Sequence, residues 1–311
     1  MAELPDCYKR VDRVIWLVQD IDKIRPAWAA IGLSDVKEYS NVEFTGQYHG
    51  KPTTINAWEI TGRLGNLNIE MIQPAEGQLN AFNDFLSKHG DGIFAVVHQV
   101  STEQEMKDEI QRMQGLSVGV LQQLVGKRNN VPATSTYFDT EPQGKFVLGL
   151  IQTSENSTQD ARDGNISVSH ISPVIRESAS VSEFWQRLGF PELNMEHATP
   201  REDSRYQGKP LWLTFDVGYQ HYTQFNYEWI VPPMAPANIY ADFLKVHQEG
   251  IQHIGLPVKD LNQAISIYEK LGYHVKQSGA WGDVGKKNSG QYAYMDTDTK
   301  GGVSVELLHA Y

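Results

Sequence analysis

The sequence of 311 residues contains a single cysteine, Cys7. One thiol cannot form an intramolecular disulfide, which favours a reducing compartment, so we expect a cytoplasmic protein. The chain also lacks an apolar run of about 18 residues, the length that a membrane-spanning helix needs. Its first ten residues lack the apolar core of a signal peptide. We therefore expect no membrane partner.

Basic residues are also scarce. The chain has 27 Lys and Arg against 38 Asp and Glu, a formal net charge of −11. Nucleic-acid binding needs clustered basic residues, so we expect no nucleic-acid partner. With 40% hydrophobic and 21% charged residues, the composition is that of a soluble globular protein. The length fits one very large domain or two ordinary ones.

An internal repeat is present. The stretch DFLKVHQEGIQHIGL from Asp242 to Leu256 aligns without a gap with DFLSKHGDGIFAVVH from Asp84 to His98, at an offset of 158 residues. One aligned position differs in kind, because His253 in the later copy faces Ala95 in the earlier one. A repeat of this length must be recognised before any motif is interpreted. The alignment suggests two halves of one fold, of which only the later half has chemistry.

The offset also holds far from this stretch. Tyr137 to Thr140 lies 157 positions before Tyr294 to Thr297, and Glu70 to Ile72 lies 158 before Glu228 to Ile230. In the first half we expect strands at 13–18, 53–60, 67–72, 93–100, 135–138 and 145–152, with helices from Asp20 to 32, at 81–89 and at 101–113. In the second half we expect strands at 166–174, 211–215, 222–230, 251–258, 291–295 and 302–308, with helices at 178–188, 240–247 and 261–271. The pattern predicts an α+β fold of four βαβββ modules.

The segment 153–164 is polar throughout and has one Ala as its only aliphatic residue. Such a composition indicates a linker, although a long surface loop within one domain would have it too. We place two domains at 1–160 and 161–311.

Two positions stand out in each quarter, the entry of the first strand and the middle of the last. In the second half, at spacings of 58, 25 and 53 residues, they hold His170, Glu228, His253 and Glu306. In the first half, at spacings of 57, 25 and 54, they hold Arg13, Glu70, Ala95 and Gly149. Two imidazoles and two carboxylates from pseudo-symmetric modules can converge on a divalent cation such as Zn, Fe, Co, Ni or Mn. The first half cannot do this, and there Arg13 and Glu70 could pair with each other.

Candidate pocket residues are less specific. Tyr292, Tyr294 and Trp281 could line a cavity, although aromatic residues in strands also fit a core. Gln224 is expected to share a strand face with Glu228 and to support it. The pair Lys286 and Lys287 could meet a phosphate or coenzyme A, or could belong to a solvated loop.

These residues resemble the vicinal oxygen chelate superfamily. The local pattern is similar to its methylmalonyl-CoA epimerase-like branch in the run HIGLPVKDL from His253 to Leu261, in Leu271-Gly272 and in the ending from Tyr292 to Leu308. The resemblance covers nearly the whole chain. It implies mixed sheets curled around a cavity, and metal ligands at His170, Glu228, His253 and Glu306.

The resemblance also implies a metal-dependent epimerase, isomerase or lyase that moves a proton next to a carbonyl of a small molecule. Glu228 and Glu306 would be ligands, and one of them could also act as the base. The first alternative is a non-haem iron, extradiol-type dioxygenase, with His170, His253 and Glu306 as its triad. Glu228 fills a position which those enzymes leave open, and their usual His and Tyr-x-x-Asp-Pro pattern is missing here. The second alternative is a metal-free, small-molecule-binding resistance protein. Either a monomer or a homodimer is expected.

Overall fold

The computed structural model describes residues 3–30, 32–65, 67–128, 130–154 and 167–311. The expected linker lies almost wholly outside these ranges. Within them no helix is long and apolar enough to span a membrane.

The first half consists of two βαβββ modules. A short 3-10 helix, η1 (Asp6–Lys9), precedes them, and the helix α2 (Ala81–His89) connects them. The first module comprises β1 (Arg13–Leu17), α1 (Ile21–Ala30), β2 (Ser34–Tyr48), β3 (Lys51–Leu64) and β4 (Leu67–Pro74). The second comprises β5 (Gly92–Val100), α3 (Glu103–Gly115), β6 (Val120–Arg128), β7 (Val131–Phe138), α4 (Glu141–Gly144) and β8 (Val147–Thr153).

The second half repeats this order, and α6 (Ile239–Val246) connects its modules. The third module comprises β9 (His170–Val174), α5 (Ala179–Arg187), β10 (Asn194–Ala198), β11 (Arg205–Tyr206), β12 (Lys209–Pro210), β13 (Phe215–His221) and β14 (Asn226–Val231). The fourth comprises β15 (Gly250–Pro257), α7 (Leu261–Lys270), β16 (Val275–Trp281), β17 (Gly290–Met295), η2 (Asp296–Lys300) and β18 (Ser304–Ala310). The predicted α+β fold of four modules is confirmed.

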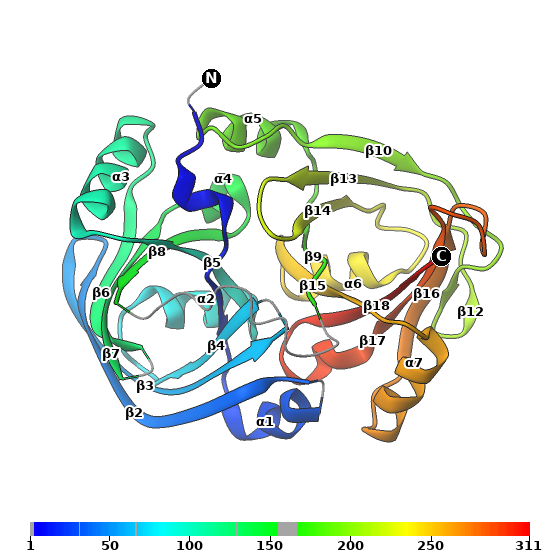
Figure 1. Ribbon diagram of the computed structural model, residues 1–311, viewed down its shortest axis with the longest axis horizontal. Coiled ribbons are helices and arrows are strands. Elements are labelled where there is room, and N and C mark those ends of the chain that lie inside the picture. The colour runs from blue at the N-terminus through cyan, green and yellow to red at the C-terminus, as the bar shows by residue number, and fades with distance from the viewer. Residues whose placement is uncertain (1–2, 31, 66, 129, 155–166) are drawn as a thin grey trace.

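Strand pairing explains how the modules form a ring. The first strand of each module pairs in parallel with the last strand of the same module, in β1–β4, β5–β8, β9–β14 and β15–β18. Within each half the two first strands pair antiparallel, as β1–β5 and β9–β15. Each half is therefore a curled sheet, with α1 and α3 or α5 and α7 at its outer side, and the two curled sheets lie side by side (Figure 1). They are joined where Ile93 of β5 pairs with Ile251 of β15.

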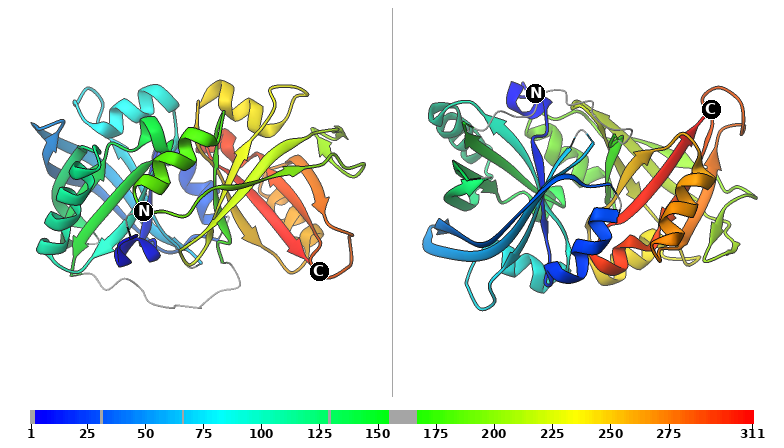
Figure 2. Two further views of the ribbon diagram at one scale, coloured as in Figure 1. Left: turned by 90° about the horizontal axis from the view of Figure 1, so that it is seen from above. Right: turned by 60° about the horizontal axis from the view of Figure 1, so that its bottom comes forward.

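Local hydrogen bonds repeat with the sequence. The side chains of Asn80 and Asn238, which are 158 residues apart, cap α2 and α6 by accepting from backbone N–H groups at 2.9 and 2.8 Å. At the junction of the halves, His89 Nδ1 donates to the backbone oxygen of His247, and His247 Nδ1 donates to that of His89, both at 2.6 Å. These helices accordingly lie next to each other on one side of the molecule (Figure 2). The contact has approximate two-fold symmetry.

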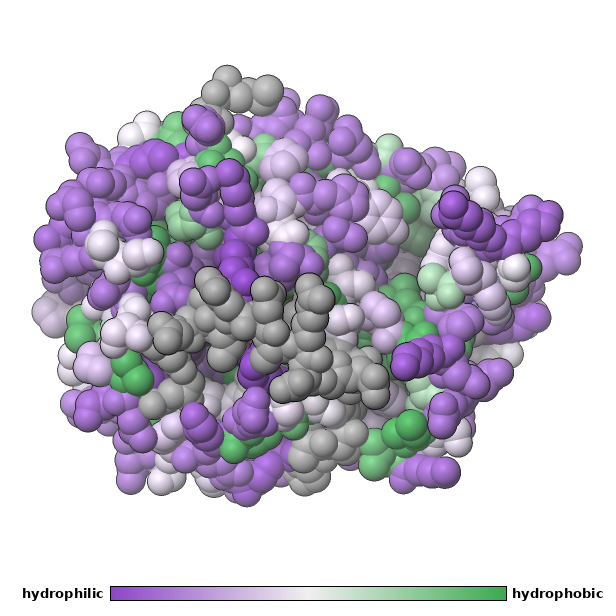
Figure 3. Space-filling view, viewed as in Figure 1, coloured by the Kyte–Doolittle hydropathy of each residue, from purple (hydrophilic) through white to green (hydrophobic). Residues whose placement is uncertain are grey.

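The interiors of the two rings differ. The N-terminal ring is packed with buried apolar side chains, among them Phe44, Phe82, Phe94 and Tyr137. The C-terminal ring contains a cavity of about 530 Å³. On the face shown in Figure 3, hydrophilic side chains cover most of the surface, and a group of apolar ones is visible within the right-hand, C-terminal half.

Some expected elements differ from the structure. The strand expected at 211–215 is wrong except for its last residue, because β13 runs from Phe215 to His221. The preceding segment instead places Leu211 and Leu213 against the cavity and exposes Trp212. The strands β2, β6, β10, β11, β12 and β16 were not expected.

Candidate metal centre

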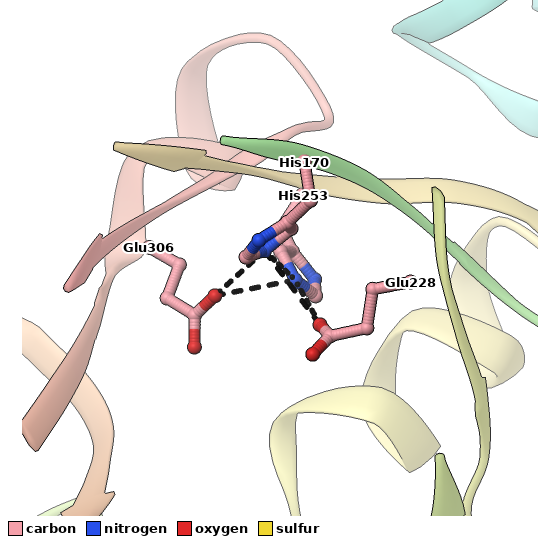
Figure 4. A group of neighbouring side chains, drawn as sticks. All are labelled: His170, Glu228, His253 and Glu306. Carbon is pink, nitrogen blue, oxygen red and sulfur yellow. Dashed lines mark hydrogen bonds and ion pairs between the residues drawn. The ribbon is translucent and has the colours of Figure 1, made fainter. Parts of the chain in front are cut away.

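Four strands of the C-terminal ring bring the candidate ligands together. His170 begins β9 and His253 lies in β15, the strand that pairs with it. Glu228 and Glu306 lie in β14 and β18, the strands on either side. All four side chains point to one place (Figure 4), where one donor atom of each lies within 4.8 Å of the others. The repeat thus identified residues that the fold places together.

The donor atoms are as close as ligands of one cation. His170 Nε2 lies 2.9 Å from Glu306 Oε2 and 3.2 Å from His253 Nε2. His253 Nε2 lies 3.1 Å from Glu228 Oε2. Neighbouring ligand atoms around a cation bound at about 2.1 Å are roughly 3 to 3.5 Å apart. Imidazole nitrogen and carboxylate oxygen are donors that Zn, Mn, Fe, Co and Ni accept, so the residues fit a divalent cation.

The outer nitrogen of each ring is already occupied. His253 Nδ1 lies 2.6 Å from Gln252 Oε1, and the amide nitrogen of Gln252 donates to Ser304 Oγ at 3.1 Å. His170 Nδ1 lies 3.2 Å from Ser169 Oγ, which donates to the backbone oxygen of residue 255. Because Nδ1 keeps its proton for these acceptors, Nε2 is the atom that can lose its proton and bind a metal.

Opposite charges within the cluster stabilise each other. Burial disfavours the charged form of His170, but the charge of Glu228 and the hydrogen bond to Glu306 outweigh it and raise the pKa of His170. Burial works against ionisation of Glu228 too, yet the neighbouring histidines and a hydrogen bond from Tyr219 lower its pKa to about 2. The carboxylates thus favour positive charge nearby, which a proton on His170 supplies and a metal would replace.

Tyr219 holds one of the two carboxylates. It lies directly across the β13–β14 ladder from Glu228 and donates to Glu228 Oε1 at 2.7 Å. Both oxygens of Glu228 are therefore engaged. Among the described residues, Glu306 Oε1 receives no hydrogen bond, while Glu306 Oε2 faces the two imidazoles. The two carboxylates are not equivalent.

Gly255 makes room for one imidazole. It lies opposite His170 in β9 and Glu306 in β18. A Cβ atom built on Gly255 would lie 2.2 Å from His170 Cε1 and 2.4 Å from Nε2, far inside any real contact. In the first half the aligned residue is Val97, which is buried. A side chain larger than that of glycine at position 255 and an imidazole at position 170 therefore cannot both be accommodated.

Three of the four candidate pocket residues line the cavity beside the cluster: Trp281, Tyr292 and Tyr294. The prediction for Gln224 has to be corrected. Its side chain accepts from the backbone nitrogen of Val11 at 3.0 Å and donates to the oxygen of Val11 at 2.6 Å, and it does not line the cavity. The face alternation that suggested it does not apply, because β14 begins two residues later.

Sequence reasoning missed Tyr219, Tyr240, Ser169 and Gln252. One signal was available, because Gln252 aligns with Phe94 in the repeat, a second exchange of polar for apolar beside His253. Tyr219 could not be found in this way, since its partner depends on the register of the β13–β14 hairpin.

The first half contains an ionic cluster at the equivalent place. Arg13 Nη1 lies 3.1 Å from Glu70 Oε2, and Arg128 Nε lies 2.9 Å from Glu70 Oε1, all buried. The expected pair of Arg13 and Glu70 is present. Burial, followed by the nearby charge of Glu70, raises the pKa of Glu59 to about 8. Among the described residues, only the second half has a group of metal-ligand type.

No protein-family model and no curated protein matches this sequence. Solved structures do match over nearly its whole length. A triple mutant of 4-hydroxymandelate synthase from Streptomyces coelicolor has a TM-score of 0.62 at 12% identity, over 97% of this chain and 93% of that one. The Mn(II)-bound glyoxalase from Novosphingobium aromaticivorans has a TM-score of 0.53 at 12% identity, over 97% and 82%.

A third match is a fusion protein of a xylose isomerase-like TIM barrel and 4-hydroxyphenylpyruvate dioxygenase, with a TM-score of 0.51 at 10% identity. It covers 97% of this chain and 49% of that protein. The fold of this chain is therefore that of the vicinal oxygen chelate superfamily. At such identities the likeness shows the fold alone, and the similarity to the epimerase-like branch stays a prediction.

Proposed function

We propose that this chain is a metal-dependent enzyme which moves a proton at the carbon next to a carbonyl group of a small molecule, as an isomerase, epimerase or lyase. The observation that supports it best is the convergence of His170, Glu228, His253 and Glu306 beside the cavity of the C-terminal ring, which three of the four residues line. A divalent cation there would supply Lewis-acid chemistry, polarising a carbonyl and stabilising negative charge on oxygen.

The four residues of the cluster have different roles in this proposal. His170 and His253 hold the cation through Nε2, with their outer nitrogens fixed by Ser169 and Gln252. Glu228 is the better permanent ligand, because Tyr219 and the histidines engage both of its oxygens. Glu306 is the better base, since its Oε1 has no hydrogen bond among the described residues. A base must reach the proton it removes, and a free oxygen can do so.

Glu228 also distinguishes this proposal from the dioxygenase alternative. Ring-cleaving iron chemistry needs open positions for both substrate and oxygen, whereas here a fourth protein donor lies 3.1 Å from His253 Nε2. The resistance-protein alternative needs no ligands at all, and four buried donors from four strands do not favour it.

The halves have different roles in this proposal. We assign catalysis to 161–311 and a structural role to 1–160, whose equivalent positions hold an ionic cluster instead of ligands. The metal is one of Zn, Fe, Co, Ni or Mn.

The first test is the metal content of the purified protein beside that of a His253→Ala variant, by plasma mass spectrometry. We expect about one equivalent of divalent metal, lost in the variant. No metal in either protein after reconstitution would contradict the proposal. Oxygen consumption with catechols would favour the dioxygenase.

The second test addresses the base. Hydroxy ketones incubated with the metal-loaded protein in deuterium oxide should exchange the hydrogen next to the carbonyl, as followed by NMR. Glu306→Gln should retain metal and lose exchange. Full exchange by a metal-loaded Glu306→Gln variant would show that Glu306 is not the base.

A further inference from the structure

The walls of the C-terminal cavity are apolar and aromatic. Leu213, Phe215 and Val217 line one side, and Trp281, Tyr292 and Leu308 line another. The position of Trp281 is fixed, because its ring lies over Gly290 in the paired strand, where a Cβ would come within 2.1 Å of the ring. These walls can cover a ring or a branched hydrocarbon, and a cavity of about 530 Å³ is large enough for one.

Positive charge is not available to a ligand on these walls. Arg201 is the one Lys or Arg among the described lining residues, and all three of its nitrogens are engaged. Its Nε and Nη2 each lie 3.1 Å from an oxygen of Asp203, and Nη1 donates to the backbone oxygen of Gly282 at 2.9 Å. At the rim His197 is paired with Asp216, and Glu196 adds negative charge. A carboxylate or phosphate that a ligand placed against these walls would find no unpaired lysine or arginine among the described lining residues.

Neutral hydrogen-bond donors lie deeper. The hydroxyl groups of Tyr240 and Tyr294 are 2.9 Å apart, and both side chains are buried. A phenol keeps its proton at neutral pH, so both hydroxyl groups are able to donate. One hydrogen bond between two hydroxyl groups uses one proton and leaves the other to be donated. Such a group suits a carbonyl or hydroxyl oxygen of an uncharged molecule.

Building on the proposed function, we infer that the substrate is an uncharged, largely apolar molecule with an aromatic ring or a group of similar shape, and with neighbouring carbonyl and hydroxyl oxygens. The oxygens face the four ligands, and the ring lies between the apolar walls. Carboxylated and phosphorylated substrates, and coenzyme A esters of dicarboxylic acids, are excluded by the same walls. Lys286 and Lys287, the basic pair noted in the sequence, are not among the residues that line the cavity.

Three related probes test this inference. Calorimetry measures the binding of each probe to protein whose metal content is known. α-Hydroxyacetophenone carries the ring and both oxygens, hydroxyacetone lacks the ring, and the para-carboxylate of α-hydroxyacetophenone adds one negative charge. We expect α-hydroxyacetophenone to bind roughly tenfold or more tighter than hydroxyacetone, because its ring leaves water. The para-carboxylate should bind at least roughly tenfold more weakly than α-hydroxyacetophenone, because its charge has no partner on the walls.

A matched variant places a basic side chain on the walls of the cavity. Leu308 lines the cavity, is only partly buried and lies two residues beyond Glu306 on the same strand face. Leu308→Arg should improve the affinity for the para-carboxylate roughly tenfold relative to that for α-hydroxyacetophenone. Equal binding of the ring-containing and ring-free probes would overturn the inference. So would preferred binding of the para-carboxylate by the unchanged protein, or no binding of any probe at millimolar concentration.

Failure of the proposed function gives a different result. Protein that cannot be loaded with metal contradicts the enzyme proposal, but the preference for a ring can still be measured on it. A ring preference without metal would support the inference about the walls, and its absence would overturn it.

Discussion

Gly255→Ala is the substitution that most directly tests the geometry of the metal centre. The new Cβ would lie 2.2 Å from His170 Cε1 and 2.4 Å from Nε2, whereas carbon atoms in contact are about 3.5–4.0 Å apart. The backbone of Gly255 is not left-handed, so alanine is compatible with its conformation. The strand is paired on both sides, so the imidazole must move. We expect Nε2 of His170 to leave the cluster.

The expected decrease in metal affinity follows from the loss of one of the four donor atoms. Displacing the partner that merely orients a ligand reduces metal affinity roughly 10- to 100-fold, and displacing the ligand itself should cost at least as much. The stability of the metal-free protein should change less. Overpacking costs about 1–3 kcal/mol, and the lower entropy of the unfolded alanine chain returns about 0.4–1 kcal/mol.

Competition with a metal chelator measures the affinity, and urea unfolding of the metal-free protein measures the stability. Gly115→Ala is the matched control, because a Cβ there meets no atom within 4 Å. In a His170→Ala background the Gly255 substitution should have no further effect on affinity, since the ring it displaces is gone. Unchanged affinity in the single variant, or an equal loss in both backgrounds, would refute the reasoning.

Three further predictions concern residues around the two interiors. Gln252→Leu removes the acceptor of His253 Nδ1 and should lower metal affinity about 10–100-fold in the same competition assay, and an unchanged value would contradict this. Glu70→Gln removes the carboxylate that Arg128 contacts at 2.9 Å and should cost about 3–5 kcal/mol in urea unfolding without changing metal content. A cost below about 1 kcal/mol would show that the cluster is not structural. Glu59, whose pKa is raised in the folded state, contributes stability that is complete below its ordinary pKa and is lost as pH rises through about 8. Glu59→Gln should therefore lose less stability than the unchanged protein between about pH 6 and about pH 9, and equal losses would contradict this.

The ligands could be found from the sequence because the repeat is a geometric constraint. Residues at equivalent positions of pseudo-symmetric modules must lie around one axis, so His170 and His253 converge whatever lies between them. Helix boundaries were also accessible, as for α2 (Ala81–His89), because its cap residue Asn80 and the following Gly90 mark both ends.

The remaining strands lacked such signals. Of the 15 residues of β2 only Phe44 and Tyr48 are buried, so the alternation that reveals a strand is missing. The opposite error occurred at 211–215, where Leu211 and Leu213 alternate with exposed Trp212 although the segment is not a strand. Contacts across hairpins, such as that of Tyr219 with Glu228, depend on register, which local sequence does not specify.

The reciprocal contact between His89 and His247 has a consequence for the history of the chain. The imidazole of each histidine donates to the backbone oxygen of the other histidine. This is the arrangement of a symmetric homodimer, in which one surface meets its own copy. Fusion of two such copies would turn an association that depends on protein concentration into a permanent one. It would also free each copy to mutate alone. The N-terminal copy could then replace metal ligands by Arg13, Ala95 and Gly149, while the contact between His89 and His247 held the two copies together.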